Sequence, residues 1–269
     1  MTVNIKKIAI LMLMVATATY LYPLFFMLFR SISDSSAALA GDSWGFTLEN
    51  YRTVLGGAGF SIFALNSLIV LFFVVAGNIV FSVMCGYALT RYTFPGKKIF
   101  FSIILGTLMI PRQVLAVPIL DLMTKIGLHN SLSAMILPFL ADSFNIFLIR
   151  QYLQGIPKDL EEAARVDGAT ELQVLLKVVF PICRPALALI IVNTTITTWN
   201  SFLFPLILTD SADKRTLPVG LSMFTQGPFS TDWGALMAGA AVSSLPIILI
   251  FLVFQREIIA GITSGALKD

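Results

Sequence analysis

Six apolar stretches, each long enough to cross a lipid bilayer, constrain this chain more than any other feature of its sequence. A helix of about 20 residues, rising about 1.5 Å per residue, spans the ~30 Å hydrocarbon core. Because lipid satisfies no backbone polar group, an open chain crosses it only as a helix. The sequence therefore predicts an all-α, polytopic membrane protein, with residues 1–269 forming a single transmembrane domain. Its six predicted spans cover approximately residues 8–29, 65–88, 99–119, 133–152, 185–208 and 238–259.

The composition supports the same class. Of the 269 residues, 57% are hydrophobic and 12% are charged, whereas soluble domains are about a quarter charged. A soluble fold of this size would not bury so much apolar surface, so the surplus must face hydrocarbon. The net charge of +3 gives no case for a nucleic-acid partner. Cys85, Cys183 and the single histidine, His129, have neither disulfide-framework nor metal-ligand spacing, so no metal site is predicted.

The first apolar stretch has a second interpretation, a cleaved signal peptide. Lys6 and Lys7 precede it, and Ala16-Thr17-Ala18 resembles a small-residue cleavage site. However, the apolar stretch continues through Tyr20–Phe29, beyond the apolar region of a signal peptide. We therefore interpret it as a retained membrane helix.

The basic residues predict the orientation of the chain. With the N-terminus in the cytoplasm, 12 of the 18 Lys and Arg residues fall on the inner side, as the positive-inside rule requires. Both termini and the 153–184 loop then lie on the cytoplasmic side of the inner membrane. The outer loops 30–64 and 209–237 are long and rich in turn formers. They are either linkers or a surface for an extracytoplasmic partner.

The 153–184 loop has a helical pattern of its own. Five of the chain's 15 acidic residues lie within Asp159–Glu171, where they favour a helix N-terminus. Leu160, Ala163 and Ala164 fall on one small apolar face. A glycine, Gly168, suits the end of this helix, and Thr170 with Gln173 forms a capping-box pattern for a second one.

This loop helix has two possible partners, anionic lipid or a soluble protein. Helices that bind lipid surfaces are rich in Lys and Arg, and lipid headgroups would repel five acidic residues. We therefore predict that the loop docks a soluble protein.

Two motifs connect the chain to a known family. The loop sequence resembles the signature loop of permease subunits of ABC importers, with Val and Phe in place of the commoner Ile and Leu near its end. The C-terminus resembles the Gly-x-Thr-x-Gly-Ala-x-Lys tail of carbohydrate importer permeases, and the whole chain is similar to the smaller, six-span subunit of maltose-type systems. The residues that carry the resemblance are Glu162, Ala163, Ala164, Asp167, Gly168, Val178, Phe180, Pro181, Trp199, Asn200, Gly261, Thr263, Gly265 and Lys268.

The resemblance implies a type I ABC importer permease fold whose cytoplasmic loop carries a coupling helix. It implies that Glu162 meets a basic group of an ATPase subunit, while Glu161 receives no role. The implied partners are a second, larger permease subunit, two ATPase subunits, an extracytoplasmic solute-binding protein, membrane lipid and a carbohydrate substrate. The ATPase contacts would be Glu162, Ala163, Ala164, Asp167 and Gly168 in the loop, and Gly261, Thr263, Gly265 and Lys268 in the tail.

Catalytic motifs are missing from the sequence. It contains no G-x-x-x-x-G-K-[ST] phosphate-binding loop, so we expect a partner ATPase to bind ATP and Mg. With one histidine, no Ser/His/Asp or Cys/His arrangement is plausible. We expect this chain to be no enzyme and to hold no cofactor, but to convert the closure of the ATPase into helix movement.

The predicted span 185–208 carries the densest group of polar residues. Asn193, Thr197, Asn200 and Phe204 fall on one helical stripe, beside Trp199. This stripe predicts either one wall of a water-filled path, where Trp199 could stack on a sugar, or hydrogen bonds that hold neighbouring helices together.

Asp142 lies in or near the fourth predicted span, where a charge is costly unless it is paired or hydrated. Arg150 is eight residues away, too far along a helix to pair with it. No functional role is predicted for Asp142.

These features together predict the transmembrane subunit of an ATP-driven ABC importer for a carbohydrate. One alternative is an importer of a non-sugar solute such as a polyol or glycerol phosphate, because only the tail and Trp199-Asn200 favour sugar. Another is a non-transporting membrane scaffold for an ATPase, which the polar stripe argues against.

Overall fold

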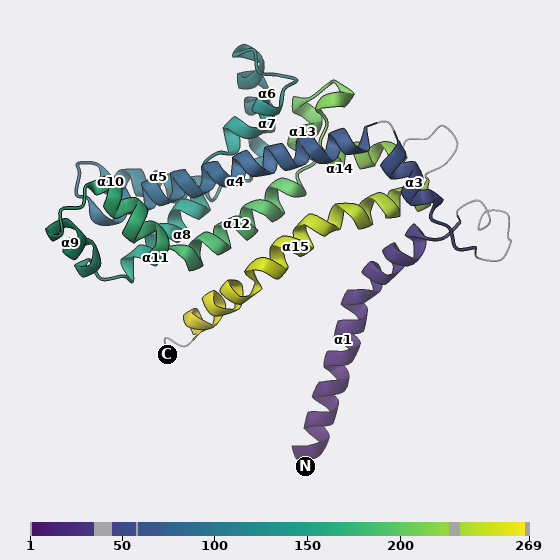
Figure 1. Ribbon diagram of the computed structural model, residues 1–269, viewed down its shortest axis with the longest axis horizontal. Helices are drawn as coiled ribbons and strands as arrows, with labels where there is room; N and C mark the ends of the chain where they lie inside the picture. Colours follow the sequence, from purple (N-terminus) through teal and green to yellow (C-terminus); the bar gives the residue numbers. More distant parts are fainter. Residues whose placement is uncertain (1, 35–44, 58, 226–231, 267–269) are drawn as a thin grey trace.

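The computed structural model describes residues 2–34, 45–57, 59–225 and 232–266, which are helical almost throughout (Figure 1). Within these ranges the β pairing consists of one isolated bridge, between Ser33 and Phe46. The predicted all-α class is confirmed. In chain order the helical elements are α1 (Thr2–Ser31), α3 (Glu49–Gly56), α4 (Phe60–Arg91), α5 (Lys97–Thr107), η1 (Arg112–Leu115), α6 (Ala116–Lys125), α7 (Leu132–Ile136), η2 (Leu137–Phe139), α8 (Ser143–Gln154), α9 (Asp159–Val166), α10 (Glu171–Val174), the π-helix η3 (Leu175–Val179), α11 (Phe180–Ile182), α12 (Arg184–Trp199), α13 (Leu203–Leu208), η4 (Ala212–Lys214), α14 (Leu217–Ser222), η5 (Met223–Thr225) and α15 (Trp233–Ala266).

Several of these helices are long and apolar enough to cross a membrane. Among the described residues four segments qualify alone, namely Lys6–Ser31, Phe60–Arg91, Leu132–Gln154 and Trp233–Arg256. Two bent pairs raise the number to six if each pair is one span. These are Lys97–Thr107 with Arg112–Lys125, bent by 97°, and Glu171–Ile182 with Arg184–Trp199, bent by 76°.

The predicted span 133–152 is interrupted at residues 140–142, between η2 and α8, and two further predicted spans are not continuous helices. The stretch 99–119 is interrupted after Thr107, because Pro111 lacks a backbone N–H and disfavours helical geometry in the residue before it. The stretch 185–208 ends its helix at Trp199 and begins another, α13, at Leu203. Pro205 lies in the first turn of α13, where proline is tolerated. These breaks correct the prediction that each of these stretches forms one helix.

Helix α4 is the centre of the bundle, and it packs against both α8 and α12, while α12 also contacts α15. At Gly86 of α4 a Cβ atom would lie 2.5 Å from Cγ2 of Ile149, so α8 approaches closely only because this residue is glycine. A buried cluster including Val83, Ile149, Leu153 and Val174 surrounds this contact.

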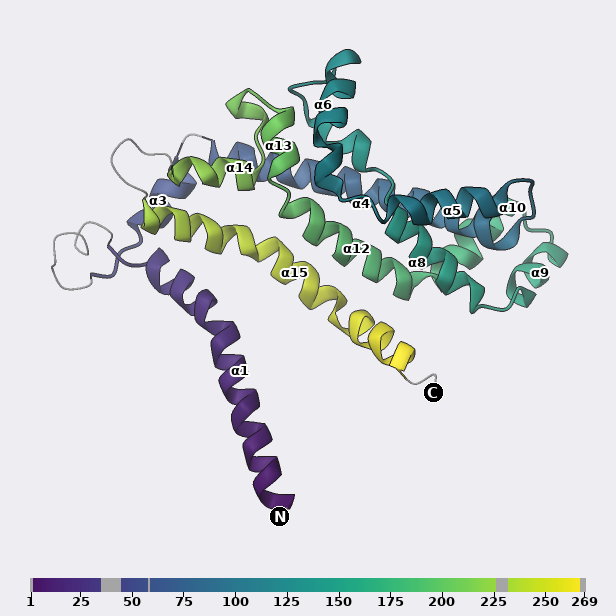
Figure 2. The same ribbon diagram turned by 180° about the vertical axis from the view of Figure 1, so that it is seen from behind.

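The two ends of the bundle differ. Helices α9 and α10 lie at one end of α4, and α3 and α14 lie at the other (Figures 1 and 2). Helix α1 meets the bundle near α3 and then diverges from it (Figures 1 and 2). Its apolar side chains, such as Met12 and Leu13, are exposed.

Candidate functional site

The segment from α9 to α10 is the helix–turn–helix predicted from the sequence. Acidic residues occupy the first turn of α9, and Gly168 adopts φ +85° beyond its end. The Thr170 hydroxyl accepts a hydrogen bond from the Gln173 backbone, and the Gln173 side chain accepts one from the Thr170 backbone. The predicted capping box is therefore confirmed.

One side of α9 faces outward. Glu162 and Ala163 are exposed, as are Asp167 and Gly168. Leu160 is also exposed, but Ala164 is partly buried and packs against the cluster around Ile149. The predicted single face of Leu160, Ala163 and Ala164 is thus divided between the surface and the bundle. What remains exposed is a small, acidic and partly apolar surface.

The other side of α9 is fastened to α4 through Glu161, a residue for which the sequence predicted no role. Its side chain is 3% exposed, and its Oε1 accepts a hydrogen bond from Nε of Arg91 at 2.7 Å. Arg91 also donates to the carbonyl oxygen of Ile156 at 3.1 Å. Buried carboxylates require such partners. In the sequence, Glu161 is only an acidic residue on the side of α9 that faces the bundle. Its role becomes clear only when its distant partner, Arg91, is known.

A second charged contact closes the turn between α9 and α10. Nε of Arg165 donates to Oε1 of Glu171 at 2.7 Å, and the Tyr92 hydroxyl donates to Oε2 at 2.7 Å. Arg165 also donates to the Tyr87 hydroxyl at 3.1 Å. The hydrogen bond from Arg165, followed by that from Tyr92, lowers the pKa of Glu171 to about 2. The same bond to Glu171 raises the pKa of Tyr92.

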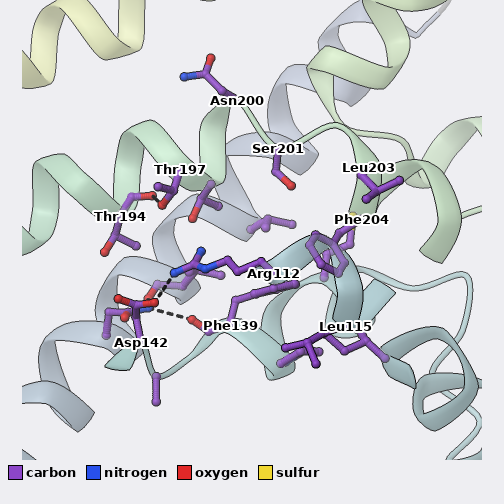
Figure 3. A pocket seen from close by; sticks show the side chains of 18 of the residues that line it. Arg112, Leu115, Phe139, Asp142, Thr194, Thr197, Asn200, Ser201, Leu203 and Phe204 are labelled. Atoms are coloured by element: carbon purple, nitrogen blue, oxygen red, sulfur yellow. Dashed lines mark hydrogen bonds and ion pairs between the residues drawn. The ribbon is translucent and has the colours of Figure 1, made fainter. Parts of the chain in front are cut away.

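A cavity of about 770 Å³ lies where the two broken spans meet α4 (Figure 3). Most of its polar lining consists of hydroxyl and amide groups. Among the described residues, the charged side chains that line it are Arg112 and Asp142, which form an ion pair. The uncharged polar side chains of the lining are Ser67, Asn78, Thr107, Gln113, Ser143, Asn145, Asn193, Thr194, Thr197, Thr198, Asn200, Ser201 and Thr216.

The predicted stripe of the fifth span lies on this cavity. Asn193, Thr197, Asn200 and Phe204 all line it, and the last three are labelled in Figure 3. Thr197 and Asn200 hydrogen-bond carbonyl groups of their own helix and remain exposed. The hydrogen-bonding positions that these two bonds leave unused face the open volume of the cavity.

Trp199 does not line the cavity with them. It is 5% exposed, and its indole N–H donates to the carbonyl oxygen of Ser243 in α15 at 2.9 Å. The prediction that Trp199 lines the path is therefore corrected: a buried indole needs a partner for its N–H, and here that partner lies on the far side of α12.

Polar residues also hold the helices together, as the alternative interpretation expected. The amide of Asn145 donates to Oδ1 of Asn78 at 2.9 Å and to the Thr194 hydroxyl at 3.0 Å. Asn193 reaches Oδ1 of Asn145 at 3.4 Å. This cluster joins α4, α8 and α12 beside the cavity. Both interpretations of the polar residues in the fifth span therefore apply: some atoms line the cavity, and others hold the helices together.

The partner of Asp142 comes from elsewhere in the chain. One carboxylate oxygen caps α8 by accepting from the backbone of Phe144 and Asn145, and the other pairs with Arg112 from η1 (Figure 3). Arg150 instead lies 3.8 Å from the centroid of the Phe101 ring. Spacing along one helix could not have identified Arg112.

The structure describes only the backbone of most of the tail motif. Gly261, Thr263 and Gly265 fall within α15, where no side-chain placement is described. Lys268 lies outside the described residues. The predicted tail contacts therefore stay a prediction.

The fold and these two sites define a multi-pass membrane protein of the transporter class. The family of binding-protein-dependent transport system inner membrane components matches residues 78–263. This chain belongs to that family, and the predicted importer permease fold is confirmed.

Individual relatives agree with the family. The chain is 34% identical to the arabinooligosaccharides transport system permease protein of Bacillus subtilis, over 98% of this chain and 97% of the relative. It is 30% identical to the sn-glycerol-3-phosphate transport system permease protein of Shigella flexneri, over 94% of each chain. Among solved structures, it matches a bacterial ABC transporter involved in the import of the acidic polysaccharide alginate, with a TM-score of 0.83 and 26% identity, over 94% of this chain and 96% of the other.

Proposed function

We propose that this chain is the smaller permease subunit of an ATP-driven importer that moves an uncharged carbohydrate across the cytoplasmic membrane. The observation that carries the proposal is the cavity. Its volume of about 770 Å³ falls in the range of small-molecule sites, about 300–1,000 Å³. Hydroxyl and amide groups that face open volume suit the many donors and acceptors of a sugar. The printed names of the relatives, such as an arabinooligosaccharide permease, agree.

Glycerol phosphate is the second candidate, since one relative is named for it. A phosphate ester is recognised by cations whose charge is free to meet it. The Arg112 charge is already matched by Asp142, so the cavity favours a neutral solute. Uptake of labelled neutral sugars and of glycerol phosphate by the reconstituted transporter decides between them, and ATP hydrolysis without any solute flux would instead indicate a scaffold.

The outward side of α9 is the proposed docking surface for an ATPase. Two ATPase subunits would serve the transporter and bind its ATP and Mg, so that this chain is itself no enzyme. In support, Glu162 and Ala163 are exposed at the end of the bundle opposite α3 and α14. On this proposal α9 and both termini are cytoplasmic, and the α3 and α14 end faces the extracytoplasmic binding protein. The exposed apolar surface of α1 is available to lipid and to the larger permease subunit.

Reversal of the Glu162 charge tests the docking surface. Glu162→Arg is expected to abolish both co-purification with the ATPase and solute uptake, because opposed like charges at an interface cost several kcal/mol. For co-purification with the ATPase, Glu49→Arg is the matched control, since Glu49 is an exposed acid at the opposite end of the bundle. Normal ATPase binding by Glu162→Arg would contradict the docking proposal.

A further inference from the structure

The contact between α9 and α4 differs from the other ion pairs of the described residues in its burial. Both side chains are almost inaccessible, Arg91 at 6% and Glu161 at 3%, whereas pairs such as Arg52–Glu49 are exposed. Exposed pairs contribute little, but removing one member of a buried pair leaves a charge without a partner. This contact therefore joins two segments 70 residues apart with a bond that is hard to break.

A second contact prevents α9 from rotating about the first. Arg165, one turn after Glu161, bonds Glu171 beyond the turn and the hydroxyl of Tyr87 in α4. Tyr92, the residue that follows α4, bonds the same Glu171. Because Glu161 and Arg165 both contact side chains of α4, α9 is joined to the end of α4 at two places, and these segments form one body.

From this body α4 runs without interruption to the cavity. It is a single helix of 32 residues, and its Ser67, Val70, Val74 and Asn78 line the cavity wall. The covalent route from α9 to the polar stripe of α12 is different. It passes through the π-helix η3 and a 76° bend before α12. A continuous helix transmits a displacement that a bent, irregular connection absorbs.

We propose that Arg91 and Glu161 are positioning residues for transport: their ion pair transmits movement of α9 through α4 to the cavity. The inference rests on the proposed docking of an ATPase on the outward side of α9. It assigns different tasks to two adjacent carboxylates. Glu162 receives the partner, and Glu161 passes the movement on.

The test measures solute transported per ATP hydrolysed by the complete reconstituted transporter. Glu161→Gln keeps the shape of the side chain but removes its charge. We expect the ATPase to co-purify as with the wild type and the transport-to-ATP ratio to fall at least fivefold. Glu162→Gln, the matched control, is expected to weaken ATPase binding while the bound complexes keep the wild-type ratio.

Arg91 supplies the second variant, which separates transmission from folding. Arg91→Lys keeps the charge and should retain more of the transport-to-ATP ratio than Arg91→Met, although both lose the geometry of the guanidinium. A wild-type ratio in Glu161→Gln would overturn the inference, as would loss of ATPase binding in Glu161→Gln alone. Failure of the wild-type chain to bind any ATPase would instead refute the proposed function.

Discussion

The end of the bundle at α9 and the cavity use polar groups in opposite ways. Around α9, carboxylates and cations are paired with one another, as in Arg91–Glu161 and Arg165–Glu171. In the cavity, hydroxyl and amide groups such as Thr197 and Asn200 satisfy part of their hydrogen bonding within their own helix and leave the rest open. The groups proposed to transmit movement are paired with one another, whereas the groups proposed to meet a solute keep part of their hydrogen-bonding capacity free. Four predictions test this contrast, beginning with the largest effect.

A larger side chain at Gly86, where α4 packs against α8, should be the most damaging change. In Gly86→Val, the new Cβ would lie 2.5 and 2.8 Å from the Cγ2 and Cβ atoms of Ile149, and overpacking of this kind costs about 1–3 kcal/mol. Thermal unfolding in detergent should show a lower midpoint. Gly106→Ala is the control, because nothing lies within 4 Å of its Cβ position. Equal midpoints for the two variants would mean that α4 and α8 are not tightly joined.

The amide cluster beside the cavity should contribute less. Asn145→Leu removes three hydrogen bonds, to Asn78, Thr194 and Asn193, and bonds between membrane helices average ~0.6 kcal/mol each. We expect a loss of about 2 kcal/mol in the free energy of unfolding. If uptake falls without any change in unfolding, Asn145 belongs to the solute-binding groups rather than to the helix contacts.

Thr197 should affect solute binding rather than stability. Thr197→Val removes a hydroxyl that lines the cavity, and a hydrogen bond is worth about 0.5–1.5 kcal/mol, so the solute concentration for half-maximal uptake should rise roughly 2- to 10-fold. Thr195→Val is the control, since the Thr195 hydroxyl is buried and has no hydrogen-bond partner. The same shift in both variants would place the effect outside the cavity.

The smallest effect concerns pH. The pKa of Glu171 is lowered to about 2, so its contribution to stability is fully present above its ordinary pKa near 4.5 and is lost as pH falls through 2. The difference in unfolding midpoint between the wild type and Glu171→Gln should therefore stay constant from pH 8 to pH 5 and shrink below about 4. A difference that does not shrink as pH falls from about 4 toward 2 would show that the pair with Arg165 is weaker than its geometry indicates.

Apolar composition predicted where helices lie but not where they are continuous. The stretch 99–119 is predominantly apolar, yet it bends by 97° near Pro111. A hydrophobic stretch reports the preference of side chains for lipid, whereas continuity depends on the backbone donor that proline lacks. The sequence held this signal in Ile110-Pro111, and the same bend brings Arg112 to the cavity.

The local structure of the 153–184 loop was determined by sequence alone. The acidic first turn of α9, the left-handed Gly168 and the Thr170–Gln173 capping box involve residues only three or four apart, so their hydrogen bonds form within the segment itself. Membership in the transporter family also followed from residues in this loop and the tail. Interactions of this range depend on spacing, which a sequence displays directly.

Tertiary structure decided what each of these side chains faces. Glu161 and Glu162 are adjacent acids in the same helical turn, yet one is buried because Arg91, 70 residues earlier, lies beside it. Trp199 turns to Ser243 rather than to the polar stripe, and Asp142 pairs with Arg112 rather than with Arg150 of the following helix. Burial and pairing of this kind arise where separate helices meet, and the positions of those meetings depend on packing across the whole bundle.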